Sequence, residues 1–356
     1  MATQILSGDS GIFSSEQQFI RPRNSRVSLD LLNDLNFIWE FQPAGAELRH
    51  EEISLANDSR FIEAYFNQPL TNYAIGGWDK TDYDAELEFL APAVQVPRRF
   101  TYAEWKNSEA FLSDGTNEDL RAIGADFPRA EYTRTKTSAQ TDNRGLTIRV
   151  DMDEVAETPG WQEKYVGMLT NRLKRNQLRR VKTVLSAAAT NTAKTWDQTA
   201  GKSPDQDIRS ELIVARDLLG LRPNRVVYGD TAWDKRCFSL DAQNNAGGYR
   251  SSGYTPEQLA AYLQVDGVRV SKAVYQNTTT TKAQIVANLV LMFTAYSGAG
   301  VDDPSNIKRF WSPTASGGPV RVYIQQISAK LYDITVELYD LTKITSTIGI
   351  RQFTIS

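Results

Sequence analysis

The chain has 356 residues, of which 41% are hydrophobic and 23% are charged, enough apolar content for a sizeable core and about two domains. Its formal net charge is -3, so the protein as a whole is not a polycation that coats nucleic acid, and any such contact must be local. One cysteine and one histidine exclude an intramolecular disulfide and a zinc site built from several Cys or His ligands.

The amino-terminal region is expected to be an arm. Its first residues, MATQILSGDSGIFSSEQQF, lack a basic segment followed by an apolar stretch, so no secretory signal is expected. Residues 1–86 predict an extended arm with short helices, one of them over residues 28–40. The most apolar run of the chain, IVANLVLMF at 285–293, is too short to span a bilayer, so we expect a buried strand and no membrane association.

The strongest local signal is a long helix that follows a polar arm. Residues 124–150, GADFPRAEYTRTKTSAQTDNRGLTIRV, predict an extended, two-stranded arm. Glu157, Thr158 and Pro159 are residue types that begin helices, and apolar residues then recur at helical spacing as far as Ala188, which predicts a long helix that starts near Glu157. At about 1.5 Å per residue this is a rod of roughly 50 Å. An arm followed by such a rod favours contacts with neighbouring subunits over enclosure of a substrate.

Basic residues are concentrated on this predicted helix. Acids lie at its start and cations follow, an order that suits the helix dipole. The expected basic strip consists of Arg172, Arg175, Arg179, Arg180 and Lys182. Two interpretations stay open: a solvated face that meets acidic residues of a neighbour, and a strip that touches nucleic acid or another internal partner.

Catalytic chemistry has little support in the sequence. There is no GxGxxG after a strand, no complete phosphate loop, no HExxH and no EF-hand spacing. Cys237 is expected to be an inert thiol, and His50, in AELRHEE, an exposed or ion-paired imidazole. The acids near Asp151 and Asp303 are better explained by a helix start and a turn than as metal ligands. We therefore expect no enzymatic activity, no cofactor and no metal site.

A mixed α/β region is expected beyond a boundary near residue 200. The expected helices cover residues 205–219, closed by Gly220, residues 230–238, and the segment after the N-cap Thr255. The expected strands cover residues 225–228, 268–274 and 283–293, the last one central because it is apolar on both faces. Residues 243–253 predict a flexible loop. Beyond Pro313, alternating apolar and β-branched residues predict half-buried strands.

Several segments follow one another in a distinctive order: LAPAVQVPRRFTYAEW, GADFPRAEYTRT, GLTIRVDMDEVA, the long helix, TWD and GLRPNRVVYGDTAW. Over residues 87–356 this order resembles the major capsid protein of tailed bacteriophages with the HK97-type fold. The fold implied by the resemblance is α+β, with a long spine helix at about residues 157–193, an extended β-hairpin loop, and peripheral and axial domains.

The resemblance divides the chain into five regions. They are an N-terminal arm (1–86), an extension loop with the strands that lead into it (87–150), the spine helix of the peripheral domain (151–203), an axial domain (204–304), and the C-terminal strands of the peripheral domain (305–356). The loop residues expected to make intersubunit contacts are Arg129, Glu131, Arg134, Lys136, Asp142 and Arg144. A buried pair at such an interface gives specificity more than affinity.

The function implied is self-assembly of hexamers and pentamers into an icosahedral shell that encloses double-stranded DNA, in a virion assembled in the host cytoplasm. A separate scaffolding protein and a portal are the implied partners, and the packaged DNA is expected to be touched only locally. Two alternatives remain. One is an encapsulin-type nanocompartment shell with the same fold; the other, from a different class, is a metal-dependent hydrolase that uses the acidic clusters.

Overall fold

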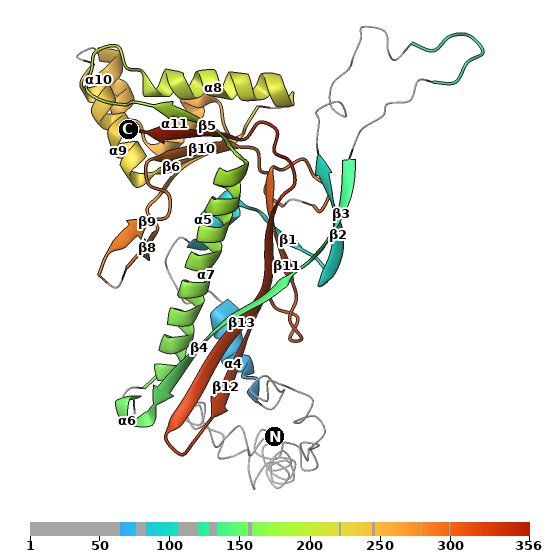
Figure 1. The fold of residues 1–356 in the computed structure, drawn as a ribbon, viewed down its shortest axis with the longest axis vertical. Helices are drawn as coiled ribbons and strands as arrows, with labels where there is room; N and C mark the ends of the chain where they lie inside the picture. Colours follow the sequence, from blue (N-terminus) through green and yellow to red (C-terminus); the bar gives the residue numbers. More distant parts are fainter. Residues whose placement is uncertain are drawn as a thin grey trace, which may run out of the picture. The chain divides into compact units, whose positions relative to one another are not determined.

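A computed structural model describes residues 65–75, 83–105, 120–127, 134–155, 159–220, 222–243, 246–278, 280–298 and 300–356, and Figure 1 shows its elements in chain order. The helix expected at 28–40 and the residue His50 lie outside the described residues. The chain divides into two compact units. The first comprises residues 1–76, 146–169 and 321–336, and the second comprises 77–145, 170–320 and 337–356.

The long helix is present as α7 (Trp161–Ala188), with bounds that differ from the expected 157–193. It ends at Ala188, and the next residues form a strand instead, β5 (Thr190–Lys194), which pairs in parallel with β14 (Arg351–Ile355). Thr and Asn are weak helix formers, and the hydrogen bonds to β14 compensate the backbone for leaving the helix. None of the described helices is long and apolar enough to cross a membrane.

The first unit contains α4 (Gln68–Ile75), α6 (Met152–Val155), most of β12 (Val320–Gln326) and the start of β13 (Leu331–Ile344). The turn before α4 is bonded to β12, because the Asn67 N–H donates to the Val322 carbonyl at 3.1 Å. In return the Val322 N–H donates to Thr71 Oγ1 at 3.0 Å. The Trp161 ring at the start of α7 packs against Tyr332, with centroids 6.2 Å apart.

The second unit is built around a mixed sheet of order β5-β14-β10-β6-β7. Its middle strand is β10 (Leu289–Phe293), which runs antiparallel to β14 and to β6 (Arg225–Gly229), while β6 is parallel to β7 (Gly267–Ser271). Successive β10 residues belong to different cores: Leu291 and Phe293 to one cluster, Val290 and Met292 to another. The prediction of a central strand apolar on both faces is confirmed.

The strand expected at 283–293 is divided in two. Its first part, β9 (Lys282–Gln284), pairs antiparallel with β8 (Val274–Gln276), and β10 begins only at Leu289. Between them the Ile285 N–H donates to the Ala273 carbonyl at 2.8 Å, and the Asn288 carbonyl accepts from Ile355 at 2.8 Å. The Ala273 carbonyl lies off the β10 ladder, so Ile285 is not part of that strand, whereas the Asn288 bond continues the pairing of β10 with β14.

Helices cover both faces of this sheet. One cluster contains Leu178, Val181 and Leu185 of α7 with two leucines of α5 (Tyr83–Leu90). The other contains residues of α8 (Pro204–Leu219) and α11 (Pro256–Leu263). Two predicted helix ends are confirmed: Gly220 closes α8 with φ 75°, and Thr255 forms a capping box at α11.

The flexible loop expected at 243–253 contains a helix, and that prediction was wrong. α10 (Ala246–Ser252) packs against α9 (Asp230–Asp241). The reason is a long-range contact: the guanidinium of the fully buried Arg236 donates to the Ser251 carbonyl at 2.9 Å and to both carboxylate oxygens of Asp205, at 2.6 and 2.8 Å. A carbonyl at the end of α10 is thereby satisfied.

A second sheet has the order β1-β11-β13-β12, and β4 (Asp142–Asp151) also pairs with β13. β1 (Ala93–Gln95) is parallel to β11 (Ile307–Ser312), which is antiparallel to β13. Residues 331–336 of β13 belong to the first unit and the rest to the second. The half-buried strands predicted beyond Pro313 are thus present as β12, β13 and β14.

Candidate functional site

A two-stranded ribbon carries the segment predicted to reach other subunits. β2 (Arg99–Trp105) pairs antiparallel with β3 (Arg134–Gln140), from Arg99 opposite Gln140 to Trp105 opposite Arg134. Residues 106–133 connect the two strands. At the base of the ribbon, the rings of Phe100 and Tyr102 pack on Phe310, with centroids 4.7 and 5.5 Å away.

The pairing of this ribbon corrects the arm expected at 124–150. The two strands of that expected arm are β3 and β4, and they do not pair with each other. β3 pairs with β2, and β4 pairs with β13. Arg149 forms an ion pair with Asp333 at 2.8 Å, and the hydroxyls of Thr147 and Thr335 lie 2.7 Å apart. These cross-strand partners, distant in sequence, fix β4 on β13 and leave β3 to pair with β2.

Residues 120–127, within the connection, are exposed throughout. Three are large and apolar: Leu120 is 71% exposed, Ile123 is fully exposed and Phe127 is 70% exposed. The Ala125 N–H donates to the Ala122 carbonyl at 3.1 Å, closing a turn in which Gly124 has φ 86°. The turn therefore holds apolar side chains in solvent, where they gain nothing unless another surface covers them.

The loop residues predicted to make intersubunit contacts fall into three groups. Arg129 and Glu131 lie outside the described residues. Lys136 is exposed on β3, and Arg134 lies on the same strand opposite Trp105. Asp142 and Arg144 form an ion pair with each other at 2.6 Å on β4.

The basic strip on α7 is partly engaged by its own chain. The guanidinium of Arg175 lies 5.5 Å from the Tyr83 ring centroid and donates to the Tyr83 hydroxyl at 3.3 Å. Arg179 lies 3.9 Å over the Tyr275 ring, and Arg180 pairs with Asp340 at 2.9 Å. Arg172 is exposed and Lys182 half-buried. These contacts combine charge with stacking, so the strip has a structural role independent of any external partner.

Strip and loop residues meet at one pocket of about 460 Å³. We call it the arginine pocket; its polar lining is Arg144, Asn176, Arg179, Arg180, Thr183 and Thr342. Asp340, whose side chain is 2% exposed, binds two of these arginines, because Arg144 Nε lies 3.2 Å from its other carboxylate oxygen. It also accepts from Gln177 at 3.2 Å. The sequence predicted these cations separately and missed Asp340, whose only signal was an acid within an otherwise strand-like run.

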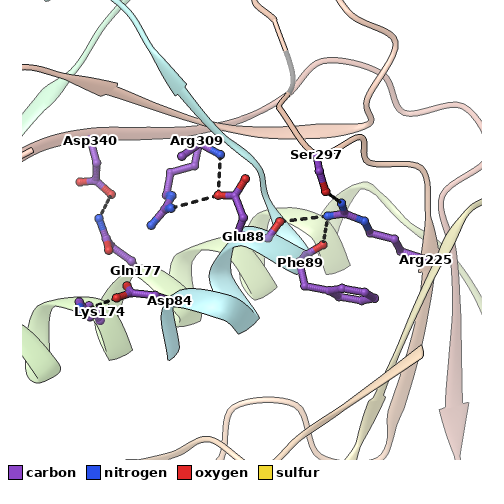
Figure 2. A network of polar contacts seen from close by, with 10 residues as sticks. Asp84, Glu88, Phe89, Lys174, Gln177, Arg225, Ser297, Arg309 and Asp340 are labelled. Carbon is purple, nitrogen blue, oxygen red and sulfur yellow. Dashed lines mark hydrogen bonds and ion pairs between the residues drawn. The ribbon is translucent and has the colours of Figure 1, made fainter. Parts of the chain in front are cut away.

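A short helix near the start of the second unit is tied to several elements, as Figure 2 shows. At its start, Asp84 accepts from Lys174 of α7 at 2.6 Å. Further along α5, Glu88 lies 3.7 Å from the guanidinium of Arg309 on β11 and accepts from the Ala93 N–H at 3.0 Å. Burial lowers the pKa of Arg309, and Glu88 opposes that shift. α5 thus joins α7 to the second sheet.

The carboxyl end of α5 is capped by an arginine from the central sheet. Arg225 donates to the carbonyls of Glu88 and Phe89 at 3.0 and 2.6 Å, and to Ser297 Oγ at 2.7 Å (Figure 2). Its guanidinium also lies 5.0 Å from the Phe89 ring centroid. Cations and donors at a helix C-terminus satisfy carbonyls that the helix leaves unpaired. No sequence pattern indicated this contact.

Two of the acidic residues considered as metal ligands, Asp153 and Asp303, bind cations of the same chain. Asp153 pairs with Lys330 at 2.7 Å. Asp303 pairs at 2.8 Å with the buried Lys308, whose ammonium also donates to three backbone carbonyls. Burial lowers the pKa of Lys308, and Asp303 opposes the shift. Within the described part of the chain, no three His, Cys, Asp or Glu side chains are grouped as metal ligands would be.

Comparison with solved structures defines the class of fold. A phage-related protein from Bordetella bronchiseptica is similar with a TM-score of 0.59 and 14% sequence identity, over 81% of this chain and 96% of that chain. At this identity the likeness is one of fold. The α+β, HK97-type architecture predicted from the sequence, with its long helix and extended hairpin, is confirmed.

Two further structures are less similar. The capsid of the cyanophage P-SCSP1u has a TM-score of 0.46 and 11% identity, over 76% of this chain and 88% of that chain. The putative capsid protein of a prophage of E. coli CFT073 has a TM-score of 0.45 and 12% identity, over 82% and 99%. No protein-family model matches the sequence, and no curated protein matches it significantly.

Proposed function

We propose that this chain is a major capsid protein that self-assembles as hexamers and pentamers into an icosahedral shell enclosing double-stranded DNA. The observation that carries the proposal is the exposed turn at residues 120–127, with three large apolar side chains in solvent between the strands of the ribbon. A segment of this kind gains free energy only when another surface buries it. In a shell, that surface belongs to a neighbouring subunit.

The five regions acquire roles under this proposal. The N-terminal arm (1–86), the extension loop (87–150) and the spine region (151–203) join subunits. The axial domain (204–304) and the C-terminal strands (305–356) complete each capsomer. A separate scaffolding protein and a portal act as partners, and the shell assembles in the host cytoplasm as part of the virion. The packaged DNA meets only local basic surface, in keeping with a net charge of -3.

Electron microscopy of the purified full chain tests the proposal. The protein is imaged alone and with a scaffold encoded beside it, at several concentrations and salt levels. Shells, or rings of six and five subunits, are expected. A monomer or dimer that persists under every condition, with the scaffold present, would overturn the proposal.

A paired variant tests the observation itself. Replacing Ile123 and Phe127 by Ser removes most of the exposed apolar surface of the turn, so assembly should be lost or should require roughly tenfold more protein. The free energy of unfolding of the unassembled chain should change by less than about 0.5 kcal/mol, because these side chains are exposed. Assembly at the parent concentration would count against a role for the turn.

The alternative function is that of an encapsulin-type nanocompartment, which has the same fold and holds protein cargo. Shell contents and diameter distinguish the two. Shells that package DNA in infected or induced cells favour a capsid, whereas small shells of uniform diameter that co-purify with an enzyme favour a nanocompartment.

A further inference from the structure

We infer that the arginine pocket binds the carboxylate of Asp126 from a second copy of this chain. The inference rests on the proposed function, because it names one contact through which subunits join. It brings together two features that lie in the same unit and have no assigned counterpart: a positively charged pocket and an exposed turn with one acid.

The pocket has positive charge in excess. Arg144, Arg179 and Arg180 line it, and two carboxylates bind those arginines, Asp142 at 2.6 Å and Asp340 at 2.9 Å. Three cations against two anions leave one positive charge. The hydroxyl of Thr342 is buried at the same pocket without a hydrogen-bond partner. A carboxylate placed here would meet guanidinium donors and a hydroxyl donor, which form short, charge-assisted hydrogen bonds.

The shape of the pocket favours a side chain over nucleic acid. Its volume of about 460 Å³ lies between α7 and the strands β4 and β13, and Val184 and Leu341 provide apolar walls. A pocket of this size takes a side chain with an apolar neighbour. The phosphates of a DNA duplex lie on its convex outer surface, so they would contact exposed cations rather than enter a recess.

The turn at residues 120–127 has the complementary chemistry. Asp126 is the one acid of the turn and Arg121 its one base, whose guanidinium lies 5.2 Å from the Phe127 ring centroid. Asp126 is exposed and forms no ion pair with any described residue. Phe127 follows Asp126 in the sequence and Ile123 lies in the same turn. They are 70% and 105% exposed and supply apolar groups for the Val184 and Leu341 walls. Charge and apolar surface therefore match at both ends of the contact.

A binding experiment tests the contact directly. The full chain is prepared as Asp126→Lys, which on this inference cannot fill the pocket of a neighbour and so leaves its own pocket free. A fluorescent peptide of residues 120–128, LRAIGADFP, is titrated by anisotropy up to millimolar concentration. It should bind, and a peptide with Asn in place of Asp126 should bind at least about tenfold more weakly.

Changes in the pocket should mirror that loss. Adding Arg179→Gln, or Thr342→Val, to the protein should weaken peptide binding several-fold to tenfold. Both changes spare the arginines that hold the buried Asp340, and circular dichroism checks that each variant keeps the parent fold. The matched control is Arg209→Gln on the exposed face of α8, which should leave binding unchanged. No peptide binding, or equal binding by the Asn peptide, overturns the inference.

Two further comparisons, with a DNA duplex and with shell assembly, show whether the inference, the proposed function or both have failed. If a short DNA duplex binds the same protein with the same dependence on Arg179 while the peptide does not, the pocket is a nucleic-acid contact and the inference is wrong. If the parent chain forms shells but peptide binding ignores Arg179, only the inference fails. If the peptide binds as expected but no shells form, the contact between copies stands and the proposed function fails.

Discussion

Arg180 donates a hydrogen bond to a carboxylate oxygen of Asp340 at 2.9 Å, joining α7 to β13 across 160 positions of sequence. Asp340 is buried, and it also accepts from Gln177 at 3.2 Å, so one carboxylate satisfies donors spaced three residues apart on the helix. Buried carboxylates are stable only when they are paired in this way. The pair therefore fixes the position of α7 on the strand within the second unit.

Replacing Arg180 by Met should destabilise the chain. The substitution keeps the apolar stem but removes one of the donors to a buried carboxylate, which costs about 1–3 kcal/mol. Urea unfolding followed by circular dichroism measures the change. Arg209→Met, at an exposed position of α8, is the control and should stay within about 0.5 kcal/mol of the parent. Equal midpoints for the two variants would contradict a role for the Arg180 pair.

Replacing Arg225 by Lys should also destabilise the chain, although the charge is kept. A guanidinium reaches the carbonyls of Glu88 and Phe89 and the Ser297 hydroxyl together, whereas an ammonium on a single stem cannot match that fork. We expect a loss of roughly 1–3 kcal/mol in the free energy of unfolding. The exposed Arg250→Lys serves as the control. Amide hydrogen exchange should show faster opening of α5 in the variant, and unchanged protection there would refute the capping role.

Gly229 should tolerate no side chain. A Cβ at this position would lie 1.7 Å from the Ala287 carbonyl oxygen, so Gly229→Ala requires the backbone of either residue to move. The expected cost is about 3 kcal/mol or more, with loss of soluble protein as the readout at expression temperature. Gly300→Ala is the matched control, since a Cβ there meets nothing within 4 Å. A stable Gly229→Ala protein would show that the two segments lie further apart.

The Cys237 thiol should be slow to react. Burial raises its pKa above the ordinary value of 9.0, and the guanidinium of Arg236 only partly opposes that shift. The folded thiol therefore stays protonated at pH values where the unfolded thiol ionises, and stability falls as the pH rises through 9.0 and above. Alkylation by iodoacetamide should show a midpoint above that of the urea-unfolded chain. A midpoint at or below the unfolded one would reopen a nucleophilic role.

The elements that sequence predicted well are those with local causes. The Thr255 capping box and the Gly220 stop depend on residues within one turn of the helix end. The alternation of Val290, Leu291, Met292 and Phe293 between two cores follows from the geometry of a single strand. The long helix was predicted for the same reason, since its apolar spacing repeats along one segment.

The elements that the sequence did not predict depend on partners far away along the chain. The last turn expected in α7 became β5 because β14, far along the chain, offers an edge to pair with. β3 pairs with β2 and not with β4, because Asp333 and Thr335 of β13 bind β4. A register or a strand partner depends on the whole fold and leaves no trace in a short window.

The candidate site shows the same distinction between local and long-range causes. The residue types can be seen in the sequence alone: a run of arginines on a long helix, a polar arm with Arg144, and an acid among apolar residues at 120–127. That Arg144, Arg179 and Arg180 meet at one pocket, where Asp340 binds two of them, depends on the packing of α7 against β4 and β13. Helical periodicity specifies which side chains share a face, but charge pairs across 160 residues form only when strand order and helix packing bring the two segments within bonding distance.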